Sequence, residues 1–249
     1  MNLRNKNFNL KIILVEPSGP LNIGSVARLC SNFQVDELRL VSPLCDINSL
    51  ETKKMALKGI KFINNSSIYK CLKDAIKDCD LVLATCGRIE YAKEFEHESL
   101  ENISNWTKKF KKIKNLALVF GREDRGLTNK ELLMANKVLT IDTNENFPSL
   151  NLSHAVSIVL YELLKKTKGK NKKDKIELNL ASSKQIEDSF LEIENLLLKA
   201  GYILPHTSNS KISKFKKYIY RANTTKHELN ILRGIVHQIN WALENPKKL

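Results

Sequence analysis

The chain has 249 residues, of which 42% are hydrophobic, so it can build a core of domain size and is too apolar for a disordered chain. Its 41 Lys and Arg outnumber 27 Asp and Glu, which gives a formal charge of +14. This excess favours a polyanionic partner, nucleic acid before a membrane, because no basic amphipathic segment carries an aromatic face.

Short apolar runs alternate with helical patterns over the first two thirds of the chain. We predict strands at residues 11–15, 37–41, 81–85, 116–120 and 138–141, and helices at residues 22–33 and 155–164. Continuous apolar strands between helices are typical of a parallel sheet with helices on both faces. Ligands bind such sheets at the carboxyl ends of the strands, where the loops emerge.

The remaining residues predict a separate helical unit. Residues 165–175 hold seven lysines and no apolar residue, which indicates a solvated linker. We therefore expect a first domain at residues 1–165, a basic linker at 166–175 and a helical extension at 176–249.

The extension should contain three helices. Ser182-x-x-Gln185 predicts the start of the first helix and Gly201 its end. Apolar residues from Ile212 to Ile219 mark the second. Thr225-x-x-Glu228 predicts the start of the third, whose leucines and isoleucines up to Leu243 follow a heptad spacing.

The cysteines indicate a reducing compartment. The chain has five of them, with no Cys-x-x-Cys pair, so we predict free thiols and no metal site. The apolar run Leu10–Val15 contains Lys11 and is too short for a signal segment or a membrane span. We expect a soluble, cytoplasmic protein.

Three loops after predicted strands carry the polar residues that could form a site. The chain lacks a G-x-x-x-x-G-K-[ST] loop, a G-x-G-x-x-G loop after a strand and a G-x-S-x-G elbow, which argues against a P-loop NTPase, a dinucleotide oxidoreductase and an α/β-hydrolase. Ser149 and Asn151 precede a helix and can either cap it or bind a ligand. Arg28 can either pair with a carboxylate or recognise a phosphate or hydroxyl.

The sequences of these three loops, and their order along the chain, resemble those of a known family. Asn22-x-Gly24-x-x-x-Arg28, Phe120-Gly121-x-Glu123-x-x-Gly126-Leu127 and Pro148-Ser149-Leu150-Asn151-Leu152-Ser153 resemble the three motifs of the SpoU/TrmH-type RNA 2′-O-methyltransferases of the SPOUT class. The resemblance spans about residues 10–165. Residues 228–235, with a basic run before them, resemble the C-terminal extension of the TrmJ-like tRNA branch.

This resemblance implies an α/β fold with a C-terminal trefoil knot and S-adenosylmethionine bound in the knot. The implied cofactor-binding positions are Thr85, Cys86, Gly87, Gly121, Ile141, Pro148, Ser149, Leu150, Asn151 and Leu152. The implied catalytic positions are Arg28, Asn22, Glu123, Ser149 and Asn151.

Each catalytic position has an expected role. A guanidinium stays protonated in proteins, so Arg28 would stabilise the alkoxide that forms on the ribose 2′-OH and hold the adjacent phosphate. Asn22 would orient Arg28 or the ribose. Glu123 would fix its loop by pairing with an arginine, and Ser149 and Asn151 would serve the cofactor and substrate hydroxyls.

The resemblance implies a tRNA (cytidine/uridine-2′-O-)-methyltransferase that acts on anticodon-loop position 32. A 23S rRNA ribose methyltransferase and a catalytically silent RNA-binding protein of the same fold are the alternatives. Three basic clusters could bind RNA phosphates. One is the linker, and the other two consist of five residues each. They are Lys108, Lys109, Lys111, Lys112 and Lys114, and Lys211, Lys214, Lys216, Lys217 and Arg221.

The resemblance also implies a homodimer. Residues 153–164 are apolar all round, so we expect them to be buried both by the sheet and by a second protomer. A glutamate at Val159 is then expected to weaken both dimerisation and cofactor binding.

Overall fold

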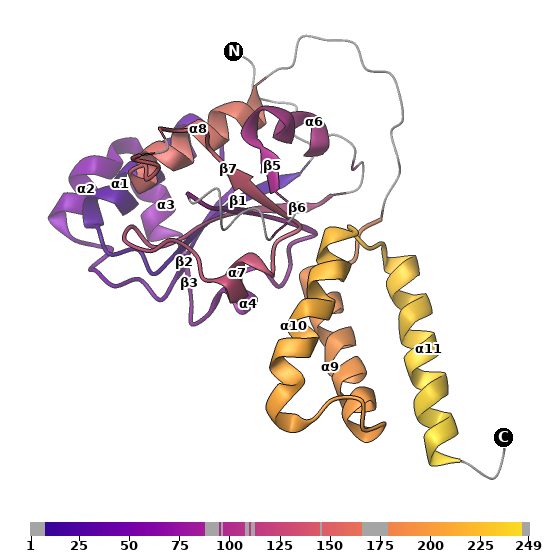
Figure 1. Cartoon of the computed structure of the whole chain (residues 1–249). Coiled ribbons are helices and arrows are strands. Elements are labelled where there is room, and N and C mark those ends of the chain that lie inside the picture. Colours follow the sequence, from indigo (N-terminus) through magenta and orange to yellow (C-terminus); the bar gives the residue numbers. More distant parts are fainter. Residues whose placement is uncertain are drawn as a thin grey trace.

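The computed structural model describes residues 8–87, 95, 97–107, 110, 113–144, 146–165 and 179–245. Figure 1 shows an α/β domain from which three helices project at one side. The strands are β1 Asn9–Val15, β2 Glu37–Val41, β3 Ser67–Tyr69, β4 Leu81–Thr85, β5 His97–Ser99, β6 Asn115–Phe120 and β7 Lys137–Thr140. They form one sheet in the order β3-β2-β1-β6-β4-β7-β5, and every pair is parallel.

The five predicted strands are confirmed, with ends that differ by at most two residues. The two strands that we did not predict, β3 and β5, have three residues each and lie at the two edges of the sheet. A three-residue strand at the edge of a sheet has no continuous apolar run in its sequence by which it could be predicted, and β3 has no buried residue. The predicted parallel sheet is therefore confirmed, with two more strands than expected.

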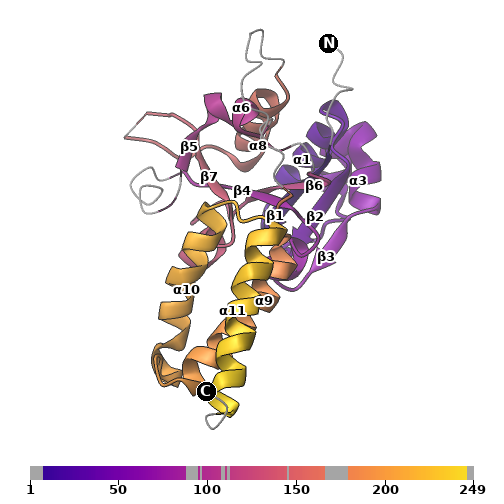
Figure 2. The same cartoon turned by 90° about the vertical axis from the view of Figure 1, so that its right-hand side faces the viewer.

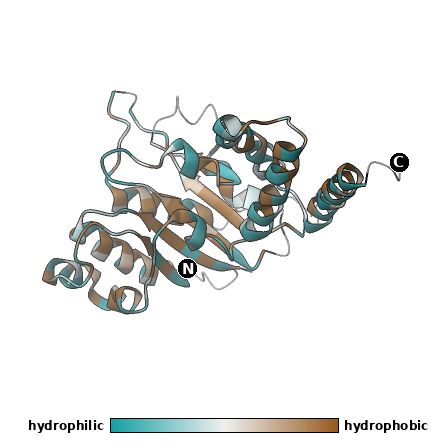
Figure 3. Ribbon diagram, turned by 90° about the horizontal axis from the view of Figure 1, so that it is seen from below, coloured by the Kyte–Doolittle hydropathy of each residue, from teal (hydrophilic) through white to brown (hydrophobic). Residues whose placement is uncertain are grey.

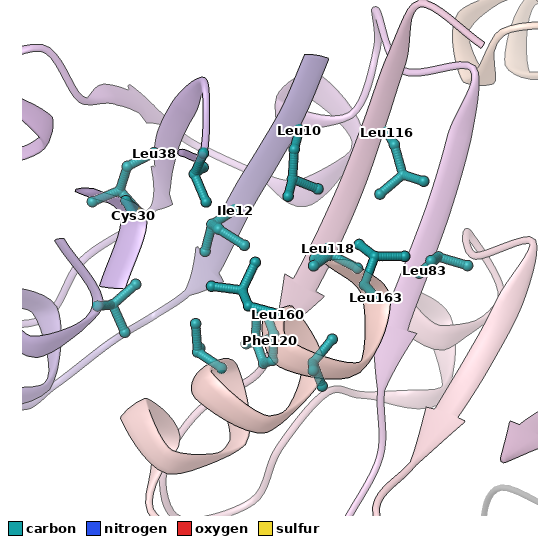
Figure 4. Close-up of a cluster of buried hydrophobic side chains, with 14 of the residues drawn as sticks. Leu10, Ile12, Cys30, Leu38, Leu83, Leu116, Leu118, Phe120, Leu160 and Leu163 are labelled. Atoms are coloured by element: carbon teal, nitrogen blue, oxygen red, sulfur yellow. The ribbon is translucent and has the colours of Figure 1, made fainter. Parts of the chain in front are cut away.

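Helices cover both faces of the sheet, as predicted. The longer ones of the domain are α1 Pro20–Asn32, α2 Leu50–Ala56 and α8 Leu152–Leu164; the shorter ones are α3 Ile60–Asn64, α4 Leu72–Ala75, α6 Ile103–Thr107 and α7 Asn129–Leu132. On one face, side chains of α1, α6 and α8 pack against alternate strand residues. Figure 4 shows Leu160 and Leu163 of α8 over Phe120 and Leu118 of β6. On the other face, α4 and α7 cover a second cluster.

Gly24 in α1 serves helix packing. A Cβ at this position would lie 2.4 Å from the carbonyl oxygen of Thr52 and 2.7 Å from the Cβ of Met55, both in α2. No side chain fits between the two helices there, so Gly24 lets α2 approach α1. The glycine of the first motif therefore has a structural reason that does not involve a ligand.

The extension folds as three helices: α9 Ser183–Lys199, α10 Pro205–Arg221 and α11 Lys226–Glu244. Figure 2 shows them side by side below the sheet, and Figure 3 shows central strands that are mostly brown, hence apolar, among helices of mixed teal and brown. Both predicted capping boxes, at Ser182 and Thr225, are present, and Gly201 has φ +72° just after α9. These helices share a core of their own.

The extension contacts the α/β domain through α9 and α10. The backbone N–H of Ser183 donates to the carbonyl oxygen of Cys79 at 3.2 Å. The nearly buried carboxylate of Glu187 binds Lys73 of the domain at 3.1 Å and Lys216 of α10 at 2.7 Å. The Glu187 carboxylate of α9 therefore binds one lysine from the α/β domain and one from the extension.

Some predictions lie outside the described residues. They concern the linker 166–175 and the lysines at 108, 109, 111 and 112. None of the five cysteines, all of which are described, is in a disulfide, and two of them, Cys30 and Cys79, are buried. Among the described residues, no helix is long and apolar enough to cross a membrane.

Candidate active site

A cavity of about 290 Å³ opens at the carboxyl ends of β4, β6 and β7, the edge at which we predicted a site. Its walls come from the residues after β4, the loop 121–127 after β6, and the segment from Ile141 to Ala155 that follows β7 and enters α8. These segments are far apart in the sequence. The order β6-β4-β7 brings their ends together.

The structure brings most of the predicted cofactor-binding residues to this cavity. Those that line it are Thr85, Cys86, Gly87, Gly121, Ile141, Pro148, Ser149, Leu150 and Leu152. Of the predicted catalytic residues, Glu123 and Ser149 line it as well, whereas Asn22, Arg28 and Asn151 do not. Sequence reasoning missed several further lining residues, including Arg122, Arg125 and Leu139.

Gly121 and Gly126 shape the loop that forms one wall. A Cβ on Gly121 would lie 2.3 Å from the carbonyl carbon of Gly126 and 2.4 Å from the backbone nitrogen of Leu127, so the chain crosses itself closely here. Gly126 has φ +70°, a conformation that side chains disfavour. The charged residues between the two glycines are thus held in a tight turn, closed by hydrogen bonds between Arg122 and Gly126.

Glu123 pairs with no arginine of the described residues, contrary to our expectation. Its carboxylate accepts hydrogen bonds from the backbone N–H groups of Ser18 and Gly19, at 3.2 and 3.1 Å, and from Nδ2 of Asn22 at 3.1 Å. The N-terminus of α1 has no side-chain cap of its own and leaves such donors free. A carboxylate from a distant loop therefore caps α1, which also suits the helix dipole.

The pKa of the Glu123 carboxyl reflects these contacts. Burial by itself would raise the pKa, but the hydrogen bonds from Asn22, Ser18 and Gly19 outweigh burial and hold the pKa below its ordinary value. Glu123 is thus ionised at neutral pH and places a fixed negative charge in the wall of the cavity.

Asn22 joins Glu123 to the third motif. Its Oδ1 accepts a hydrogen bond from Nδ2 of Asn151 at 2.9 Å. Oδ1 of Asn151 in turn caps α8 by accepting from the backbone N–H of Ser153 at 2.9 Å. Asn151 therefore caps α8 and also binds Asn22 of the first motif. The three motifs meet in the hydrogen-bonded series Glu123–Asn22–Asn151.

Arg28 stands apart from this network. It is exposed on α1, and the described residues offer it no hydrogen bond or ion pair, so the predicted alternative of a carboxylate partner is not found. Asn22 contacts Glu123 and Asn151 and does not orient Arg28. Arg28 follows Asn22 by six positions, which corresponds to about 9 Å along the helix and to directions about 120° apart around it.

Arg122, the residue before Glu123, binds two carboxylates. Glu16 accepts from its Nε and from one terminal nitrogen, both at 2.7 Å, and Glu131 accepts from both terminal nitrogens, at 2.9 and 3.0 Å. The pKa of Glu131 lies below its ordinary value because hydrogen bonds from Arg122 and Thr128 outweigh burial, which would raise it. The pKa of Glu16 is lowered mainly by its hydrogen bond with Arg122.

These lowered pKa values predict a loss of stability in acid. The carboxylates contribute stability that is fully present above their unfolded pKa, roughly 4.3, and is lost as pH falls through their lower folded pKa. We expect the free energy of unfolding, measured by urea titration, to decrease more between about pH 4.5 and 3 in the wild type than in Glu131→Gln. Equal decreases in both proteins would contradict this assignment.

In the parts of the chain that the structure describes, no group of three or more His, Cys, Asp or Glu could hold a metal ion. The lining of the cavity instead combines an apolar wall, from Leu139, Ile141, Leu150 and Leu152, with hydroxyl groups and the carboxylate of Glu123. Such a lining suits an organic ligand that has both apolar and polar parts.

Comparison with known proteins places this site in a family. Residues 9–161 match the model of the SpoU rRNA Methylase family, and residues 184–248 match the C-terminal domain of the tRNA methyltransferase TrmJ. The chain is 32% identical over 238 residues to tRNA (cytidine/uridine-2′-O-)-methyltransferase TrmJ of Pectobacterium atrosepticum, covering 93% of this chain and 96% of that protein.

Two further likenesses agree with this match. A tRNA (cytidine-2′-O-)-methyltransferase TrmJ of Sulfolobus acidocaldarius is 40% identical over 157 residues, covering 63% of this chain and 65% of that relative. The crystal structure of TrmJ from Z. mobilis ZM4 superposes with a TM-score of 0.80 at 26% identity, covering 92% of this chain and 98% of that one. The ordered motifs, the parallel sheet and these matches agree: the chain belongs to the SpoU rRNA Methylase family.

Proposed function

We propose that this protein is an S-adenosylmethionine-dependent tRNA (cytidine/uridine-2′-O-)-methyltransferase that acts on the ribose of anticodon-loop position 32. The observation that carries the proposal is the network Glu123–Asn22–Asn151, which joins all three motifs beside one cavity. The TrmJ of Pectobacterium atrosepticum, whose match covers 93% of this chain, and the match of residues 184–248 to the TrmJ C-terminal domain support tRNA over 23S rRNA as the substrate.

The cavity fits the proposed cofactor chemically. Its apolar wall suits an adenine ring, and the ionised Glu123 favours the positive sulfonium. When bound, S-adenosylmethionine supplies the methyl group. We assign its binding to Thr85, Cys86, Gly87, Gly121, Ile141 and the segment from Pro148 to Leu152, and we infer the family's trefoil knot around this segment.

The remaining roles concern the acceptor ribose. Asn22 and Glu123 hold the entrance of α1 and the third motif in a fixed relation, which positions Ser149 at the cavity. The Ser149 hydroxyl has no partner among the described residues, so it is free to bind a ligand hydroxyl. Arg28 stabilises the developing alkoxide and the adjacent phosphate as a permanent cation.

The basic side chains of α10 are proposed to contact RNA phosphates, with one change from the sequence-based set. Lys211, Lys214 and Arg221 are exposed. Lys216 pairs with Glu187 at 2.7 Å, and Lys217 lies over the ring of Phe95 at 5.1 Å from its centroid. Lys216 therefore serves the contact between the two units, and we leave it out of the proposed phosphate-binding set.

We further propose the division into a catalytic domain at residues 1–165, a linker at 166–175 and an extension at 176–249, and a cytoplasmic location. The extension has its own apolar core, which supports a separate unit. Cysteines that form no disulfide suit a reducing compartment.

A homodimer is proposed because apolar side chains remain exposed beside the cavity. Ile158 and Tyr161 of α8 are 36% and 50% exposed, and Leu21 of α1 and Phe147 of the third loop are 53% and 77% exposed. α1 and α8 are neighbours on the same face of the sheet. A second protomer would cover this surface.

The exposed fractions of the α8 side chains show that a variant other than Val159→Glu must test the dimer. Val159 is 0% exposed and belongs to the core beneath α8, so Val159→Glu would unfold the domain and say nothing of dimerisation. We expect Ile158→Glu to leave the thermal midpoint within about 5 °C of the wild type and to dissociate the dimer. Light scattering of a folded Ile158→Glu protein that stays dimeric would contradict the proposed interface.

The proposed substrate is tested by mapping ribose methylation in RNA from cells that lack this protein. Loss of the methyl group at position 32 of tRNA, restored by the wild-type gene, supports the proposal. Loss at a 23S rRNA nucleotide instead would replace the substrate with rRNA. An unchanged methylation map, together with failure of the purified protein to methylate tRNA, would leave a silent RNA-binding protein.

A further inference from the structure

All five N–H donors of Arg122 are used inside the protein. Nε donates to Glu16, one terminal nitrogen donates to Glu131 and to the carbonyl oxygen of Gly126, and the other donates to Glu16 and Glu131. A guanidinium has no more donors than these. Although Arg122 lines the cavity, its guanidinium has no N–H left to donate to a ligand, so any effect on binding must pass through the groups that it holds.

Those groups belong to three different segments. Glu16 follows β1, Gly126 closes the loop after β6, and Glu131 lies in the first turn of α7. Glu16 has φ +47°, which a non-glycine residue rarely adopts, and it also binds Arg125 at 3.2 Å. The residue after Arg122 binds in another direction, because Glu123 caps α1. The loop 121–126 is therefore fastened by Arg122 and Glu123, two of its four charged residues.

We propose that Arg122, held by Glu16 and Glu131, is a positioning residue that keeps the loop 121–126 in the shape that binds S-adenosylmethionine. The proposal rests on the proposed function, in that the cofactor occupies this cavity. The reason is geometric. Gly121 and Gly126 give the loop backbone unusual conformational freedom, and the binding of Arg122 by the carboxylates of Glu16 and Glu131 removes that freedom. A wall fixed before the ligand arrives binds more tightly than one that must be ordered on binding.

The chain offers a matched control in Arg39 of β2. Its side chain is as buried as that of Arg122, 5% against 8% exposed, and it too binds two carboxylates, Glu37 and Asp78. It also donates to one carbonyl oxygen, that of Ala75, so its five donors are used in the same pattern. Arg39 does not line the cofactor cavity. The two arginines therefore have the same hydrogen-bond pattern and similar burial, but only Arg122 lines the cavity.

The experiment compares Arg122→Lys with Arg39→Lys in the full-length protein. Lysine keeps the charge and loses the planar fork, so both variants should lower the thermal midpoint by similar amounts. Affinity for S-adenosylhomocysteine, measured by calorimetry on folded protein, should fall by about tenfold or more in Arg122→Lys and by less than about twofold in Arg39→Lys. Hydrogen exchange at residues 121–127 should increase only in Arg122→Lys.

Glu131→Gln provides a second variant, should Arg122→Lys fail to fold. It keeps the size of the side chain and weakens one fork, so affinity for S-adenosylhomocysteine should fall by about threefold or more. In both variants the KM for S-adenosylmethionine should rise, while kcat on tRNA at saturating cofactor stays within about threefold of the wild type.

Three outcomes would overturn the proposal. Unchanged affinity in Arg122→Lys and Glu131→Gln, with wild-type protein that binds S-adenosylhomocysteine, would make Arg122 a purely structural residue. Equal losses of affinity in Arg122→Lys and Arg39→Lys would lead to the same conclusion. A wild-type protein that does not bind S-adenosylhomocysteine would overturn the proposed cofactor itself, and the role of Arg122 with it.

Discussion

Replacement of Arg28 by alanine is expected to lower kcat for tRNA methylation by about 100-fold or more, because the developing alkoxide loses its cation. Affinity for S-adenosylhomocysteine should stay within about twofold of the wild type, since Arg28 does not line the cavity. The fold should be unaffected, because the side chain is exposed and the described residues offer it no partner. Single-turnover methylation and calorimetry measure the two quantities.

Arg28→Lys separates charge from shape. An ammonium keeps the positive charge but cannot form the bidentate fork of a guanidinium, so this variant should also lose most of its activity. Lys53→Ala, which removes an exposed cation of α2, is the matched control and should keep kcat within about twofold. Wild-type turnover by Arg28→Ala would remove this residue from the catalytic set.

The buried strands could be predicted from the sequence because burial on both faces leaves a continuous apolar run. β1, β2, β4, β6 and β7 all have such runs, and each was found within two residues of its ends. β3 and β5 owe their strand conformation to pairing with β2 and β7 at the edges of the sheet. That pairing is a tertiary effect that the local sequence does not encode.

The place of the site could be predicted, whereas its hydrogen bonds could not. Three loops after parallel strands must meet at one edge of the sheet, and nine of the ten expected cofactor-binding residues line the cavity there. Glu123 had neighbouring arginines on both sides in the sequence, yet it binds the N-terminus of α1, 104 residues away. Glu16 and Glu131 take the donors of Arg122 instead. Such choices depend on which backbone donors a distant helix leaves free.

The same limit applies to α8. Its sequence is apolar all round, and periodicity does not tell which apolar residue faces the sheet and which remains exposed. The structure buries Val159 and leaves Ile158 partly exposed, although the two are neighbours in the sequence. A test of the dimer chosen from the sequence alone therefore fell on a core residue.

The position of Arg28 leads to the last prediction, which concerns mixed dimers. Around α1, Arg28 points about 120° away from Asn22, the residue of that helix that reaches the site network. It is also exposed on a helix beside the surface proposed for the second protomer. We therefore expect Arg28 to act on the RNA bound at the cavity of the other protomer.

Two inactive variants should then restore activity when they are combined. Gly87→Phe serves as the second variant because Gly87 lines the cavity and a Cβ there would lie no closer than 4.0 Å to any atom of the described residues, so that the added ring would take up space in the cavity and block the cofactor. In a random mixture, half of the dimers contain one Arg28→Ala and one Gly87→Phe protomer, and one of their two sites has both an intact cavity and an intact arginine. The mixture should therefore show about a quarter of the wild-type activity. If Arg28 serves the cavity of its own chain, verified heterodimers will stay as inactive as the two parents.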